Sequence, residues 1–262
     1  MSETPPPLDN HEALEAFIGK WRARWPEWSV AEVFVPQAHR PVALAWAALQ
    51  QVFTDAAWGG SDARPGEAKL LWWQEELHGW ALGRRRHPLG ASLQRLPAPW
   101  SELAAALPTL RDSRERPSDG AEAFAQLMPL ATAAAAIEQA LFAGVQADAS
   151  AVRLVGVTWL QARLARDGAA AVPLSTLALV GENDGENDGD NNGDNNGQNN
   201  RTHDAEAWWR DELLREWPAA GRATRPRRLW AAIARARLAR GAAGQPLAAW
   251  VALWIAWRGA RD

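Results

Sequence analysis

Apolar side chains recur at intervals of three and four residues along almost the whole chain, and this helical periodicity constrains the fold most strongly. One example is the stripe Leu44, Ala45, Ala48, Leu49 and Val52. Pro41 precedes this stripe and Gly59 follows it, as proline and glycine do at the two ends of helices. Only residues 152–159 have enough β-branched side chains to resemble a strand, and their flanks favour helix. The sequence therefore predicts an all-α protein.

The same periodicity, bounded by proline, glycine and capping residues, predicts where the helices lie. They cover residues 9–25, 41–58, 65–82, 118–144, 148–168, 204–217, 226–240 and 246–258. Asp9 and Glu12 have the spacing of a capping box at the start of the first helix. Ser118 is the expected cap of the long Ala-rich helix, and Asp148 or Ser150 is the expected cap of the next one.

The composition excludes several classes of chemistry. The chain has 262 residues and no Cys, which excludes disulfides, thiolate nucleophiles and Cys-ligated zinc or iron–sulfur sites. Its five His are scattered and form no close pair of the kind that binds metals. The first residues, MSETPPPLDN, lack the basic and apolar regions of a secretory signal. The longest apolar run, 247–257, is half of the roughly 20 residues that span a bilayer, so we expect a cytoplasmic protein without a transmembrane segment.

One segment departs from the helical pattern. Residues 181–200, GENDGENDGDNNGDNNGQNN, form a degenerate repeat without apolar side chains, so burial cannot offset the entropy of ordering them. We expect a flexible N-terminus at 1–8 and a single helical domain at 9–262, interrupted by a disordered insert at 181–202. The acids from Asp184 to Asp188 resemble the start of an EF-hand, but the twelfth position is Asn195 instead of Glu, so we expect no calcium site.

Several short motifs follow one another in a recognisable order. They are FVP at 34–36 followed by Arg40, KLLWWQEEL at 69–77, GRRRHPL at 83–89, RD at 166–167 followed by VPL at 172–174, and PL at 246–247 with WIAWR at 254–258. Together they resemble the squalene/phytoene synthase family and cover most of the chain outside the insert. The resemblance implies a helical bundle of the isoprenoid-synthase type.

Active members of that family condense two prenyl diphosphates, and two D-x-x-x-D helices hold magnesium against the diphosphates. The spacing matters because carboxylates four residues apart lie on one face of a helix. Here the residue four positions after Asp55 is Gly59, and Asp167 is followed by Gly-Ala-Ala-Ala, so neither has a second carboxylate. Asp55, Asp167 and Arg40 remain the candidate catalytic residues. We expect no metal site, and Mg²⁺ only if the protein is an active enzyme.

Two hypotheses for the function follow from the resemblance and its missing carboxylates. The first is a divergent, non-catalytic squalene/phytoene synthase-like protein that binds a partner protein or a prenyl-lipid-like ligand. The second is an active prenyltransferase of isoprenoid biosynthesis with unusual metal ligands. Glu75 and Glu76 could replace one ligand, but neighbours on a helix point about 100° apart. We expect both to be solvated partners of Arg84 or Arg85.

Tryptophan is the other unusual feature, with 17 Trp and no Tyr. Trp250, Trp254 and Trp257 have the spacing of one helix face, and we name them the tryptophan stripe. We expect this stripe to pack in the core, and the alternative is a binding face for an apolar ligand or partner. Peripheral membrane association stays open as well.

A basic run is the last feature with a bearing on partners. No acid occurs between Glu216 and Asp262, and seven Arg lie between positions 222 and 240. They alternate with apolar residues, so we expect a solvated face of an amphipathic helix. No nucleic-acid-binding fold or base-stacking pattern accompanies the charge, and nucleic acid is not an expected partner.

Overall fold

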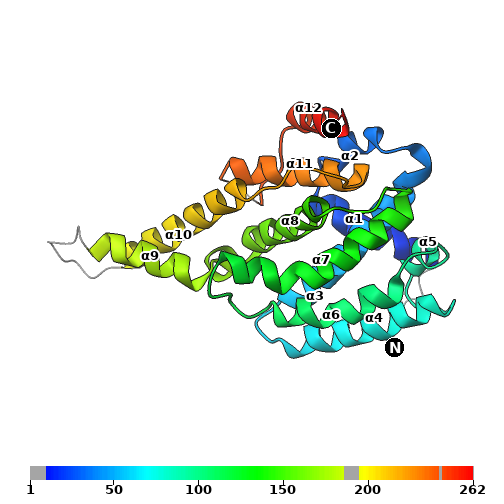
Figure 1. The fold of residues 1–262 in the computed structure, drawn as a ribbon, viewed down its shortest axis with the longest axis horizontal. Coiled ribbons are helices and arrows are strands. Elements are labelled where there is room, and N and C mark those ends of the chain that lie inside the picture. Colours follow the sequence, from blue (N-terminus) through cyan, green and yellow to red (C-terminus); the bar gives the residue numbers. More distant parts are fainter. Residues whose placement is uncertain (1–9, 186–194, 242–243, 262) are drawn as a thin grey trace, which may run out of the picture.

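The structure is a computed structural model that describes residues 10–185, 195–241 and 244–261, and these residues contain helices and no strand (Figure 1). The prediction of an all-α protein is confirmed. The α-helices are α1 (Asn10–Arg24), α2 (Trp28–Ala31), α3 (Arg40–Trp58), α4 (Arg64–Ala81), α5 (Gly90–Leu93), α6 (Trp100–Asp112), α7 (Gly120–Phe142), α8 (Ala149–Asp167), α9 (Leu174–Gly185), α10 (Asn195–Arg215), α11 (Arg225–Ala239) and α12 (Ala249–Arg261). Short 3-10 helices lie at η1 (Glu32–Phe34), η2 (Gln37–His39) and η3 (Gly168–Ala171).

The core is built around α3, whose side chains are buried on almost every face. This helix packs against α1, α4 and α6, while α7 packs against α6 and α8, and α8 against α11. Most of the buried side chains of α3 are apolar, and the small residues Ala45, Ala48 and Ala56 let its neighbours approach closely. In the described ranges no helix has both the length and the apolar character needed to cross a bilayer.

The helix caps differ in part from the expected ones. At α7 the N-cap is Asp119, whose carboxylate accepts a hydrogen bond from the backbone N–H of Glu122 at 2.8 Å. Ser118, the expected cap, instead donates its hydroxyl and its backbone N–H to the Glu122 carboxylate. At α8 Asp148 is the cap and accepts from the N–H of Ala151 at 2.9 Å. Asp9 lies outside the described residues.

Helices α9 and α10 lie side by side and extend away from the bundle, and we call this pair the arm (Figure 1). The inner part of α10 packs on α8 and η3 through the buried side chains of Ala205, Trp209 and Leu213. Both helices extend into the range expected to be a disordered insert, because α9 ends at Gly185 and α10 begins at Asn195. Extending an existing helix by a residue costs less than starting one. Residues 1–9 and 186–194 lie outside the described residues, and so do the expectations placed on them.

Candidate functional site

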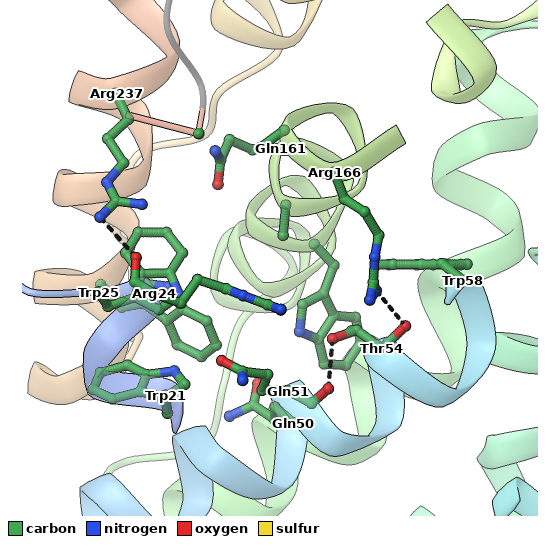
Figure 2. A pocket seen from close by; sticks show the side chains of 15 residues that line it. Trp21, Arg24, Trp25, Gln50, Gln51, Thr54, Trp58, Gln161, Arg166 and Arg237 are labelled. Atoms are coloured by element: carbon green, nitrogen blue, oxygen red, sulfur yellow. Dashed lines mark hydrogen bonds between the residues drawn. The ribbon is translucent and has the colours of Figure 1, made fainter. Parts of the chain in front are cut away.

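A cavity of about 250 Å³ lies among α1, α3, α8 and α11 (Figure 2). Five indole rings form its apolar wall: Trp21, Trp25, Trp58, Trp159 and Trp230. Its polar wall consists of guanidinium, amide and hydroxyl groups: Arg24, Gln50, Gln51, Thr54, Gln161, Arg166 and Arg237. No carboxylate belongs to the described lining, so cationic and neutral polar groups determine the chemistry of this cavity.

Asp55 lies beside the cavity on α3 and binds two arginines. Its Oδ1 accepts a hydrogen bond from Arg24 Nη1 at 2.9 Å and from Arg166 Nη2 at 2.7 Å. Arg166 also donates from Nη1 to the backbone carbonyl of Thr54 at 3.0 Å (Figure 2). The side chain of Arg24 is 49% exposed, which places this ion-pair cluster where the cavity opens to solvent. One carboxylate therefore faces two cations that come from α1 and α8.

Asp167, the second candidate acid, ends α8 and does not line the cavity. Its carboxylate lies 3.9 Å from Arg166 Nε and 4.0 Å from Arg163 Nε. Burial raises the pKa of Asp167 above its usual range, and the nearby guanidinium groups of Arg166, Arg163 and Arg114 offset only part of that effect.

The residues do not fit the magnesium site that the resemblance implies. Magnesium requires several oxygen ligands in octahedral geometry, with carboxylates to hold its charge. No group of three or more His, Cys, Asp or Glu side chains comes together anywhere in the described residues. An ion at Asp55 would also have to displace the guanidinium groups of Arg24 and Arg166.

Several buried polar atoms in the cavity wall have no hydrogen-bond partner within the described structure. They are the indole nitrogens of Trp21, Trp159 and Trp230, and Oε1 of Gln51. An unpaired buried polar group costs about 1–3 kcal/mol, so native proteins satisfy nearly all of them. These atoms are buried behind the surface of the cavity, so their missing partners do not by themselves indicate a ligand.

Two buried ion pairs brace the cavity, and the sequence analysis missed both. Arg237 donates from Nε to Glu27 at 2.8 Å, and Glu27 also accepts from the N–H of Leu247 at 2.7 Å. Arg227 binds Glu138 through Nε at 3.0 Å and through Nη2. Both arginines are 2% exposed, so the expectation of a wholly solvated basic face on α11 is wrong. Glu138 in an otherwise apolar stretch of α7 was the available signal, because a buried acid requires a cation.

Arg40, the third catalytic candidate, lies outside the lining of the cavity. Its Nε donates to the carbonyl of Val35 at 3.0 Å, and its Nη2 donates to the carbonyl of Val33 at 3.1 Å. These bonds satisfy carbonyls of the η1 segment just before α3. The structure therefore gives Arg40 contacts of a structural kind.

Glu76 differs from the solvated residue that was expected. It is 1% exposed and accepts from the backbone N–H groups of Arg86 and His87 at 2.6 and 2.8 Å, and from Trp80 Nε1 at 2.9 Å. Burial acts to raise its pKa, but these hydrogen bonds outweigh burial and lower it. Its charged partner is Arg86, at 2.9 Å, and not Arg84 or Arg85. Glu76 thus fixes the loop after α4, whereas Glu75 is exposed.

The tryptophan stripe is exposed, and the expectation that it packs in the core is wrong. Trp250 is 77% exposed, Trp254 is 53% exposed and Trp257 is 44% exposed. The helix buries a different face, formed by Val251, Ala252 and Ala256. Periodicity identified a face of α12 correctly, but it does not tell which of two usable faces turns inward. The three rings lie outside the lining of the cavity.

The comparisons with known proteins agree with the geometry at the level of the fold. No family model matches the chain, and no curated protein matches it. Among solved structures the chain is similar to the squalene synthase HpnC from Alicyclobacillus acidocaldarius, with 21% sequence identity and a TM-score of 0.51. The similarity covers 92% of this chain and 98% of that one. This protein therefore has a squalene synthase-like helical fold of the isoprenoid-synthase type.

Proposed function

We propose that this protein is a non-catalytic relative of the squalene/phytoene synthases that binds one prenyl-lipid-like ligand in its cavity. The observation that carries the proposal is the cluster of Asp55 with Arg24 and Arg166. A magnesium-dependent prenyltransferase needs free carboxylates at this position. Here the carboxylate is neutralised by the chain's own cations.

The charge at the cavity mouth fits binding of an anionic group without metal. Guanidinium groups bind phosphate and carboxylate oxygens through paired N–H donors. Arg24 and Arg166 supply such donors at the opening. An amphiphile whose anionic head lies at the opening would meet these donors.

The size and wall of the cavity favour a single apolar chain. Ligand pockets usually enclose about 300–1,000 Å³, and this cavity of about 250 Å³ lies just below that range. Two prenyl diphosphates would need far more room, whereas one short or partly inserted chain fits between the indole rings. The concave aromatic wall also favours a small ligand over a partner protein at this place.

The substitution Asp55→Asn distinguishes a ligand-binding protein from an active prenyltransferase. It removes the charge that occupies Arg24 and Arg166, so the affinity for farnesyl diphosphate, measured by calorimetry without metal, should rise about fivefold, as for one exposed charged contact of about 1 kcal/mol. Affinity for farnesol, which lacks the charge, should stay unchanged. Arg166→Gln should weaken binding of the diphosphate only. The exposed Arg85→Gln serves as the matched control.

A turnover assay tests the alternative hypothesis that the protein is an active prenyltransferase. Purified protein with farnesyl or geranylgeranyl diphosphate and Mg²⁺ should release no pyrophosphate and form no longer hydrocarbon. Steady turnover that Asp55→Asn abolishes would overturn the proposal in favour of an active prenyltransferase. Loss of farnesyl diphosphate binding in Asp55→Asn would also contradict it, because the free arginines should attract the anion.

A further inference from the structure

Helix α12 carries its large side chains on the outside. Trp250, Leu253, Trp254 and Trp257 are each at least 44% exposed, and they lie along one face together with Arg258 and Arg261. Exposed tryptophans in series are unusual, since burying an indole is among the most favourable contacts a side chain can make. We call this surface the α12 face.

The inward side of α12 is made of small residues, so the exposed rings are not needed to hold the helix. Ala252 and Ala256 are fully buried, and α12 packs against α11 and α2. A Cβ atom added at Gly259 would lie 3.3 Å from the Cβ of Ala232 on α11, which shows how closely the two helices approach. Helix α12 therefore packs on the bundle through its small side chains, and its large side chains are exposed.

The α12 face is also cationic. The guanidinium group of Arg258 lies 4.8 Å from the ring centre of Trp254, and that of Arg261 lies 4.5 Å from Trp257. No acid occurs in residues 217–261, and the neighbouring α11 exposes Arg225 and Arg235. Tryptophan beside arginine suits a boundary where an apolar phase meets negative charge, because the ring enters the apolar side and the cation stays at the polar side.

We propose that the α12 face binds the surface of a bilayer that contains anionic lipids. The helix has 13 residues, which is too short to span a membrane but sufficient to lie in the interfacial plane. Its indoles would enter the headgroup region, and Arg258 and Arg261 would bind lipid phosphates. A second copy of the chain is a poorer occupant, because a symmetric contact would bring two cationic faces together.

The test is co-sedimentation of the full chain with vesicles of phosphatidylcholine alone or with about 30% phosphatidylglycerol. The protein should bind the anionic vesicles only, and binding should weaken as salt is added. The triple variant Trp250→Ala/Trp254→Ala/Trp257→Ala should abolish it. Arg258→Gln with Arg261→Gln should lower the partition coefficient about 25-fold, since each arginine near an anionic surface contributes about fivefold.

The matched control is Trp208→Ala on α10. Trp208 is 40% exposed and lies beneath Arg215 at 5.6 Å, so it repeats the tryptophan–arginine pair on another element. This variant should bind anionic vesicles as the unchanged protein does. Because the substituted side chains are exposed, we expect all variants to fold. Circular dichroism melts check this, so that a loss of binding can be distinguished from a loss of folding.

Three outcomes would overturn the proposal. One is equal binding to neutral and anionic vesicles, and another is unchanged binding by the folded triple variant. The third is a dimer in light scattering that the triple variant converts to a monomer, with no vesicle binding by either form. That result would assign the α12 face to self-association.

Discussion

Buried charge is the feature at the residue scale that most limits which substitutions this protein tolerates. Arg227 and Glu138 are 2% and 4% exposed, and the same carboxylate accepts from Trp46 Nε1 at 2.9 Å. Arg227 also donates to Gln50 Oε1 at 2.5 Å, which ties α11 to α3 and α7. Such a pair adds little to stability compared with an apolar replacement, but it specifies which helices meet.

Removing one partner of this pair should therefore be costly. Glu138→Gln leaves the Arg227 cation buried without its counter-charge, and we expect a loss of about 3–5 kcal/mol in the free energy of unfolding. Urea denaturation measures it. The control is Glu216→Gln, which breaks the exposed pair with Arg153 and should cost less than about 1 kcal/mol. Equal costs for the two variants would contradict the burial argument.

His87 gives the protein a predicted dependence on pH. Burial lowers its pKa to about 4, against an ordinary value of 6.5, and Nδ1 accepts the N–H of Leu89 at 3.1 Å. The unfolded chain therefore binds the proton at a higher pH than the native state does. Stability from this group is present above about pH 6.5 and is lost as the pH falls towards 4, by about 1–2 kcal/mol after allowance for partial exposure.

The measurement is the urea midpoint at pH values between 4 and 7 for the unchanged protein and for His87→Asn. Asparagine keeps an acceptor for Leu89 but does not titrate. The variant should lose the part of the pH dependence that lies between about 6.5 and 4, whereas the part from Glu76, whose pKa is also lowered, should remain at lower pH. Parallel profiles would show that His87 is not the group that titrates.

At the scale of elements, the orientation of α12 determines how much stability a Trp254→Ala substitution costs. The observed orientation predicts a small cost, whereas the periodicity of the sequence favoured a large one. A buried stripe would make Trp254→Ala cost about 3–5 kcal/mol. Because Trp254 is 53% exposed, we expect a change below about 1 kcal/mol. The buried Trp209 on α10 is the comparison, and Trp209→Ala should cost the full 3–5 kcal/mol. A large destabilisation by Trp254→Ala would show that the helix turns inward.

The helices themselves were largely predictable, because periodicity and end signals are local properties of the sequence. Helix α6 was not among the predicted helices, although Leu103, Leu107 and Leu110 repeat at helical spacing. Pro108 lies inside α6 in the structure. The choice of inward face for α12 could not be predicted, since that depends on which neighbouring surface the helix meets.

The sequence identified Asp55 as a candidate residue of the site, but it could not identify the partners of Asp55. Spacing alone showed that Asp55 has no second carboxylate. Its partners Arg24 and Arg166 lie 31 and 111 positions away in the chain, and nothing in the sequence pairs them. The five indoles of the cavity wall come from four helices and one loop residue, so only the packed bundle brings them together.

At the scale of the whole molecule, the fold and the chemistry of the cavity are separate properties. The chain is similar in fold to a squalene synthase over 92% of its length, yet it lines its cavity with arginine, glutamine and tryptophan. The bundle depends on apolar burial along every helix, whereas the charge of the cavity depends on a few positions. A fold of this type therefore constrains the shape of the ligand site and leaves its reactivity open.

We expect that the outer end of the arm can be replaced without destabilising the bundle. Residues 182–199 contain no apolar side chain, whereas the buried contacts of α10 begin at Ala205. Replacing 182–199 by a short Gly-Ser linker should therefore leave the melting temperature nearly unchanged, because no apolar side chain is removed. Removing 182–209 instead deletes Ala205 and Trp209 and should lower it sharply. A loss of cooperative unfolding in the shorter replacement, followed by circular dichroism, would show that the outer end of the arm stabilises the bundle.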